Sequence, residues 1–235
     1  MADNKTHKDY LEKAKELLNY EDTSARVEEV VKLSKNYHNH KTLNADLMKD
    51  FDFDGEKLGE LEKKIRTEAL KKGKEGLSDL EAEELLKDIL EEVMIPMGYG
   101  NEHDRDTMYN QFDAYIRSMG KEGQKIHNNI LNSIKNGEGD DAVFGVRQGL
   151  KSFHINNHRR TFYRTLVPQD HESFRDELSK YITNEGNKAL KDSGELDSSQ
   201  VKLNLDEMLM HYSTGNYEEM NKKAGKKADY TPSSE

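Results

Sequence analysis

Residues 142–169 read AVFGVRQGLKSFHINNHRRTFYRTLVPQ and form the longest run of the chain without an acidic residue. Apolar residues recur every three or four positions in the first half of this run: Val143, Val146, Leu150 and Phe153. This is the spacing of one face of an α-helix, so we predict a helix over about 141–156. Gly145 and Gly149 argue against it, since each costs roughly 1 kcal/mol relative to Ala in a helix. They would be tolerated if they permit close packing of another backbone.

The second half of the run is ambiguous in secondary structure. Residues 159–167 (RRTFYRTLV) suit a strand as well as a short helix, because Thr, Phe, Tyr and Val fit both. Pro168 ends the segment in either case. The pattern leaves both alternatives open.

Outside this run, apolar stripes at helical spacing recur along nearly the whole chain. They predict helices near 7–20, 24–37, 56–72, 78–95, 108–119, 126–134, 174–182 and 201–212, with polar loops at 36–42 and 96–106. The chain has only three prolines in 235 residues, which also favours helix. We therefore predict an all-α, multi-helix, bundle-like protein, with two helical subdomains as an alternative.

Composition divides the chain into three regions. Residues 1–96 form an acidic helical region, and 97–214 form a second helical region that contains the basic and aromatic run 142–169. Residues 215–235 are polar, have little to bury, and are expected to be a mobile tail. The loop at 96–106, with its proline and glycines, is the expected junction.

Several classes of protein are excluded by composition. The chain has no cysteine, so it has no disulfide, thiolate metal site or cysteine nucleophile. No apolar run approaches the length of about 20 residues that spans a membrane, and the N-terminal residues lack the apolar core of a signal peptide. A net charge of −10 opposes indiscriminate binding to nucleic acids or anionic membranes. We expect a cytoplasmic protein without membrane contact.

Two patterns are similar to metal sites. Asp50, Asp52 and Asp54, followed by Gly55, resemble the opening of an EF-hand calcium loop, but Leu61 stands where the bidentate Glu belongs. The acidic residues are instead expected to cap the helix that follows, which leaves calcium binding as an open question.

The second pattern is a histidine pair. His154 and His158 are four residues apart and would share a helix face, as two zinc ligands do. A zinc site needs at least one more ligand, and the neighbouring Arg159 and Arg160 would repel a cation. We predict no metal and no cofactor.

The candidate binding residues all lie in the basic run. They are Arg147, Lys151, His154, His158, Arg159, Arg160 and Arg164. Arginine offers a planar fork to phosphate, and phenylalanine or tyrosine can stack on unpaired bases, so the run would suit nucleic acid or an acidic protein surface. In the alternative, the arginines pair with the protein's own carboxylates while Phe144, Phe153 and Phe162 pack in the core.

Arg147 and His154 are seven residues apart, two helical turns, and would share a face. In an all-helical domain this pair resembles the active-site motif of the HEPN ribonucleases. The resemblance covers two residues and implies that Arg147 would hold a phosphate and His154 would act as a general acid or base. Gln148 stands where the family usually has Asn, Asp or His.

No other catalytic pattern is present: the chain lacks a P-loop, a dinucleotide-binding GxGxxG after a strand, and a GxSxG elbow. We therefore predict a non-enzymatic helical interaction protein that acts through a protein partner or as a homo-oligomer. The alternative is a nucleic-acid-binding protein that uses 142–169, including a metal-independent ribonuclease with Arg147 and His154.

Overall fold

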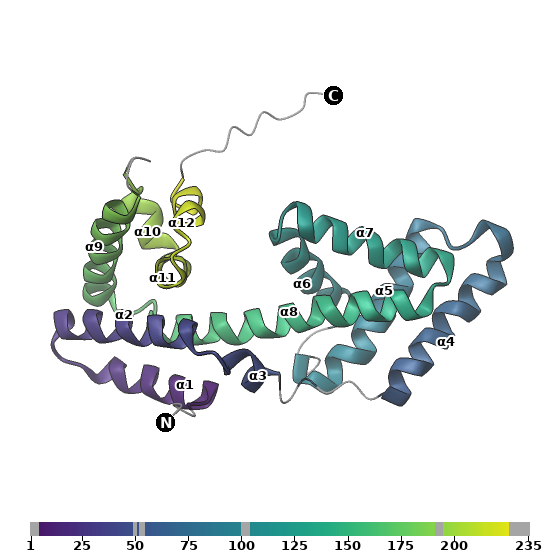
Figure 1. The fold of residues 1–235 in the computed structure, drawn as a ribbon, viewed down its shortest axis with the longest axis horizontal. Helices are drawn as coiled ribbons and strands as arrows, with labels where there is room; N and C mark the ends of the chain where they lie inside the picture. The colour runs from purple at the N-terminus through teal and green to yellow at the C-terminus, as the bar shows by residue number, and fades with distance from the viewer. Residues whose placement is uncertain (1–4, 49–50, 52–54, 100–103, 191–194, 226–235) are drawn as a thin grey trace. The chain divides into compact units, whose positions relative to one another are not determined.

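The computed structural model describes residues 5–48, 51, 55–99, 104–190 and 195–225 (Figure 1). Within these ranges the chain forms twelve α-helices and no strand, which confirms the all-α prediction. Short 3₁₀ turns follow the helix His7–Glu16 at Leu17–Asn19 and the helix Gly55–Lys72 at Gly73–Glu75, and residues 95–99 form a π-helical turn that contains Pro96.

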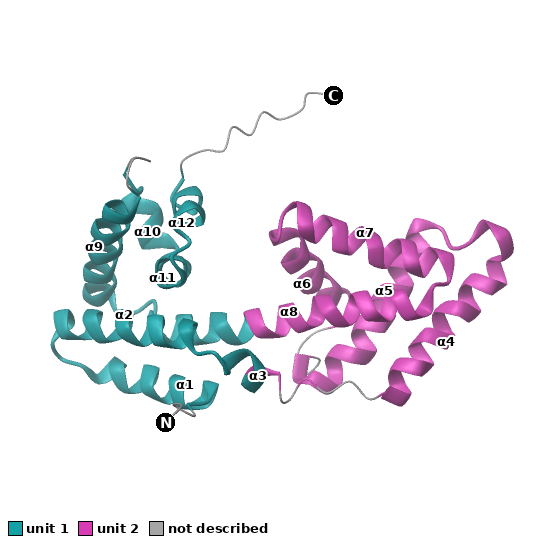
Figure 2. Ribbon diagram, in the orientation of Figure 1, with its two compact units in different colours: residues 1–46, 157–235 teal, residues 47–156 magenta. Residues whose placement is uncertain are grey.

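The chain folds into two compact units (Figure 2). Unit 1 consists of residues 1–46 and 157–235, and unit 2 consists of residues 47–156. Unit 2 is therefore continuous in sequence, whereas unit 1 is built from the two ends of the chain. The expected junction at 96–106 falls inside unit 2. The division by composition into 1–96, 97–214 and 215–235 stays a prediction.

Unit 2 is built around one hydrophobic core. Its helices are α4 (Gly55–Lys72), α5 (Asp79–Met94), α6 (Arg105–Ser118), α7 (Lys121–Asn136) and the first part of α8 (Gly139–Leu166). The core contains Leu86, Phe112, Ile116, Leu150 and Phe153 among others, all of them buried. Ser78 and Glu81 form the expected capping box at the start of α5, where each side chain bonds the backbone N–H of the other residue.

Unit 1 packs α2 against the helices that follow α8. Its helices are α1 (His7–Glu16), α2 (Thr23–Asn39), most of α3 (Leu43–Leu47), the second part of α8, α9 (Glu172–Ala189), α10 (Ser198–Leu203), α11 (Leu205–Thr214) and α12 (Tyr217–Lys223). The rings of Tyr37 and Phe162 stack in its centre, with centroids 3.8 Å apart. A buried chain of hydroxyl groups adds to this core: Ser34 Oγ donates to Tyr163 Oη at 3.3 Å and lies 2.5 Å from Ser213 Oγ.

The buried face of α8 changes along its length. In unit 2 the helix buries Val146, Leu150 and Phe153, and in unit 1 it buries Phe162 and Leu166. Phe153 and Phe162 are nine residues apart, which is two and a half helical turns, so a regular helix presents them on opposite faces. The segment 159–167 is helical through Leu166. Its buried apolar residues Phe162 and Leu166 are four residues apart, which is the spacing of one helix face.

Two segments differ from the sequence-based expectation. The polar segment 36–42 is helical as far as Asn39, because Ser34 and Tyr37 on the same helix are buried and hold this turn in place. In the expected tail, residues 217–223 form α12, and Met220 and Ala224 are buried. Residues 226–235 lie outside the described part of the chain, as do Asp50, Asp52 and Asp54 of the calcium-like pattern.

Candidate interaction surface

The seven candidate residues all lie on α8, but they do not face the same surroundings. Arg147, Lys151 and His154 belong to unit 2, whereas His158, Arg159, Arg160 and Arg164 belong to unit 1. Among them only His154 is buried; His158 and Arg159 are half-buried and the other four are exposed. The run therefore does not present one uniform basic surface.

His154 is held by the protein at both ring nitrogens. Nδ1 lies 2.9 Å from the hydroxyl of Tyr99, and Nε2 lies 3.1 Å from the carbonyl oxygen of Leu47. The side chain is only 6 % exposed, whereas Arg147 on the same helix face is exposed. A general acid or base must exchange a proton with its substrate, and here both nitrogens are engaged by protein groups. His154 thus has the surroundings of a structural histidine.

His158 packs in unit 1 against the histidine at the start of α1. The rings of His7 and His158 meet edge to face, with centroids 5.0 Å apart. His7 Nδ1 lies 3.0 Å from the Tyr37 hydroxyl, and Asp46 accepts a hydrogen bond from the His7 backbone N–H at 2.8 Å. The pKa of His7 is lowered to about 4, mainly by burial; the neighbouring His158 contributes to the decrease and Asp46 opposes it. No group of three metal-binding side chains occurs among the described residues.

Three basic side chains of α8 make no ion pair with the part of the protein that the structure describes, and a fourth bonds to an amide. Arg159 donates to the side-chain oxygen of Asn44 at 2.9 Å. Within the described ranges, Lys151, Arg160 and Arg164 make no ion pair, although ion pairs are frequent elsewhere on this acidic protein, for example between Lys135 and Asp79 at 2.6 Å. These three cations remain available to an external anionic group.

The aromatic residues of the run divide into core and surface. Phe153 and Phe162 are buried, as the core alternative expected, but Phe144 is 62 % exposed. Every other phenylalanine that the structure describes is at most 8 % exposed. Phe144 shares its solvent face with Arg147 and Lys151, which lie three and seven residues further along α8.

A groove between α7 and α8 lies beside Phe144. We call it the α7–α8 groove; its volume is about 490 Å³. Its apolar part consists of Ile126, Ile130, Phe144 and Gly145, and its polar part of Asn129, Asn132, Ser133, Glu138, Asp141 and Gln148. Gly145 makes the close approach of the helices possible, because a Cβ there would lie 2.8 Å from Cγ1 of Ile130. Sequence reasoning missed this groove, because the spacing of apolar residues predicts the two helices but not how closely they pack.

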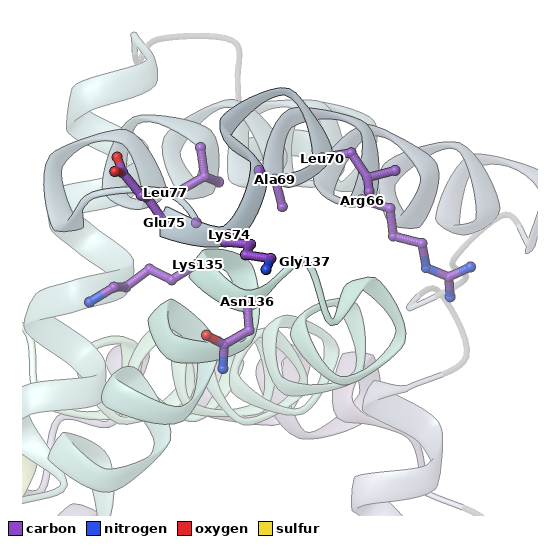
Figure 3. Close-up of a pocket in the computed structure, with 11 residues that line it drawn as sticks. Arg66, Ala69, Leu70, Lys74, Glu75, Leu77, Lys135, Asn136 and Gly137 are labelled. Carbon is purple, nitrogen blue, oxygen red and sulfur yellow. The ribbon is translucent and has the colours of Figure 1, made fainter.

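A larger hollow of about 620 Å³ lies where α4 and α7 end (Figure 3). Its shape comes from turns at Gly73, Gly76 and Gly137, all with positive φ. Two of the four charged residues that line it are paired within the protein: Arg66 pairs with Asp140, and Lys135 with Asp79. No set of reactive groups converges in it, so the geometry indicates no catalytic site there.

Comparison of the chain with known protein families, with curated proteins and with solved structures gives no match. The likeness of Arg147 and His154 to the HEPN motif therefore rests on those two residues alone. Among the helices that the structure describes, none is long and apolar enough to cross a membrane.

Proposed function

We propose that this chain is a non-enzymatic interaction protein that binds a protein partner through the α7–α8 groove and the exposed face of α8 beside it. The observation that supports this most directly is the exposure of Phe144 at the edge of the groove. Aromatic residues are enriched in protein interfaces, and Phe144 combines an exposed ring with an adjoining groove.

The chemistry of the surface agrees with a protein ligand. Full burial of a phenylalanine side chain contributes about 1.5–3 kcal/mol, which makes Phe144 a plausible anchor. The amides of Asn129 and Gln148 can donate and accept hydrogen bonds around it. Arg147 and Lys151 add positive charge on the same face, so an anionic segment of the partner would be favoured at that end.

Site-specific photo-crosslinking tests this proposal. A photoreactive phenylalanine analogue is placed at position 144 in the full chain, in the cells that produce it, and cross-linked products are identified by mass spectrometry. We expect a defined protein adduct at position 144. The matched control places the same analogue at Leu203, which is 71 % exposed on α10 of unit 1. Equal cross-linking patterns from both positions, or none from position 144, would contradict the proposed surface.

A second candidate function is nucleic-acid binding through α8 in unit 1. It is supported by Arg160 and Arg164, which lie one turn apart, are exposed, and have no ion-pair partner in the described part of the chain. The test is binding to short single- and double-stranded RNA and DNA at about 50 and 200 mM salt. If the arginines contact phosphates, the affinity of the wild type for nucleic acid should fall steeply as the salt concentration rises. The affinity of the double variant Arg160→Ala/Arg164→Ala should depend less on salt. No binding at the lower salt would remove this candidate.

A further inference from the structure

Unit 1 contains a buried arginine that lacks a counter-charge. Arg26 of α2 is 4 % exposed, and its Nε and Nη2 groups are buried and have no hydrogen-bond acceptor among the described residues. Its Nη1 donates to Nδ1 of His171 at 2.7 Å, and its guanidinium carbon lies 3.9 Å from the centre of the Phe174 ring. No carboxylate in the described ranges forms an ion pair with it. A buried cation is unfavourable unless it is paired with an anion, so an unpaired one marks a candidate anion site.

The guanidinium lies at the N-terminus of α9, which adds positive charge. His171 is the N-cap residue of this helix, and Phe174 is its third residue. The side chain of His171 makes no capping hydrogen bond to the first-turn N–H groups, and the N-terminal end of a helix carries about half a positive elementary charge. Burial lowers the pKa of Arg26, and the charge of Asp170 offsets this only in part. Arg26 and the first turn of α9 therefore form a region of uncompensated positive charge.

We propose that Arg26 and the first turn of α9 bind an oxyanion of the phosphate class, either as the free ion or as a monoester. A phosphate has several acceptor oxygens, so it can accept hydrogen bonds from the guanidinium and from helix N–H groups at the same time. A carboxylate has fewer oxygens and engages fewer of these donors. The site belongs to unit 1, so this binding activity goes beyond the one proposed for the α7–α8 groove of unit 2.

His171 controls access to the guanidinium. Because an arginine can only donate, Nδ1 of His171 is the acceptor, and the ring is neutral. The side chain of His171 is 32 % exposed, so it contacts both solvent and the buried Arg26. When the ring turns outward, Nη1 becomes free beside Nη2, and the two groups form a fork for two oxygens of the ligand. Asp170 and Glu172 are exposed acidic neighbours that oppose binding, but solvent screens them more than it screens Arg26.

Titration of the isotope-labelled full chain with inorganic phosphate tests the proposal, with the amide NMR signals as the readout. Sodium chloride holds the ionic strength constant, so that general screening does not change. We expect saturable shifts of the N–H signals of Glu172, Ser173 and Phe174, with a dissociation constant on the order of 1 mM. The absence of saturable shifts at these residues up to about 20 mM phosphate would overturn the proposal.

A parallel titration with methyl phosphate distinguishes the two sources of the anion. Binding of methyl phosphate at least as tight as that of inorganic phosphate identifies a monoester as the ligand. Weaker binding of methyl phosphate identifies the free ion. Either result supports the proposed site, because the same first-turn signals must move in both titrations.

Arg26→Gln tests the role of the buried charge. It should raise the dissociation constant for phosphate at least about 10-fold, because charge-assisted hydrogen bonds to the anion are lost. Arg160→Gln is the matched control, since it removes an exposed arginine of the same unit, and it should leave the dissociation constant within about 2-fold of the wild type. Unchanged phosphate binding by Arg26→Gln would overturn the proposal.

His171→Asp carries the test alone if Arg26→Gln does not fold. Aspartate is a favourable N-cap residue, and its carboxylate would take the place of the anion beside Arg26. Relative to His171→Ala, which also removes the ring but supplies no carboxylate, it should raise Tm by about 2–4 °C and weaken phosphate binding at least about 10-fold. His171→Ala itself should bind phosphate at least as tightly as the wild type. Equal stability and equal phosphate binding of the two variants would contradict an anion site at this position.

Discussion

At the scale of single residues, the glycines of the helices have different structural roles. A Cβ on Gly149 would lie 2.8 Å from Cζ and 3.0 Å from Cε2 of the buried Phe112 ring, well inside the normal separation of about 3.5–4.0 Å between carbons. A Cβ on Gly59 of α4 would have no atom within 4 Å. In the sequence, Gly59 and Gly149 both look like glycines within a helix. Only the packing around them shows that a side chain would be obstructed at Gly149 and not at Gly59.

This difference gives a paired prediction. Gly59→Ala should stabilise the protein by about 1 kcal/mol, since alanine is the better helix former and meets no obstruction. Gly149→Ala gains the same helix propensity but must displace the Phe112 ring, at a cost of about 1–3 kcal/mol, so it should be neutral to destabilising. Urea unfolding monitored by circular dichroism measures both. Equal stabilisation by the two substitutions would show that Phe112 is not held where the structure places it.

His7 gives unit 1 a dependence on pH. Its pKa is about 4 in the folded protein against an ordinary 6.5, so between these values the unfolded chain binds a proton that the folded chain lacks. Stability should therefore fall as the pH is lowered from about 6.5 to about 4, with a slope of at most about 1.4 kcal/mol per pH unit from this group. Tyr37, Asp46 and His158 are the groups that face it.

Comparison of the wild type with His7→Asn isolates this contribution. The variant should show a smaller loss of unfolding free energy between pH 6.5 and pH 4, because it lacks the titrating ring. The measurement is denaturant unfolding at a series of pH values. Parallel curves for the two proteins over this range would mean that His7 is not buried in its neutral form.

At the scale of secondary-structure elements, α5 depends on its N-terminal capping box. The side chain of Ser78 accepts a hydrogen bond from the Glu81 N–H, and Glu81 accepts one from the Ser78 N–H. Ser78→Ala should reduce the free energy of unfolding by about 1 kcal/mol, because the first turn of α5 loses its side-chain acceptor. Ser152→Ala on α8 is the control, since that side chain makes no hydrogen bond within the described ranges. Thermal unfolding measures the stability of both variants. Equal stability of the two would refute the capping role of Ser78.

Helix α8 shows why periodicity was informative in parts and ambiguous as a whole. Its first stripe ends at Phe153, and its second stripe contains Phe162 on the opposite face. A single amphipathic helix cannot be recognised across such a change, so the second half looked equally suited to a strand. Each half is regular when read by itself, and the boundary between the units falls at residues 156 and 157, between the two stripes.

At the scale of the whole molecule, the continuity of unit 2 predicts independent folding. The core cluster from Phe51 to Phe153 lies entirely within residues 47–156. A fragment of these residues should be helical and unfold cooperatively, whereas a fragment of 157–235 should not, because α9 and α11 lose α2, against which they pack. Circular dichroism during heating measures both. The absence of a cooperative transition in 47–156 would contradict the assignment of a self-sufficient core.

The sequence by itself determined the fold class, most helix positions and the capping box at Ser78, because helix propensity, apolar spacing and capping act over a few neighbouring residues. It also located the basic run on α8 that holds all seven candidate residues. It did not determine which side chains of the run face solvent: His154 is buried and bonded to Tyr99 and Leu47, and Phe144 is exposed whereas Phe153 and Phe162 are buried. Burial and the α7–α8 groove depend on helices brought together across long sequence separations. Only the tertiary structure decides those contacts.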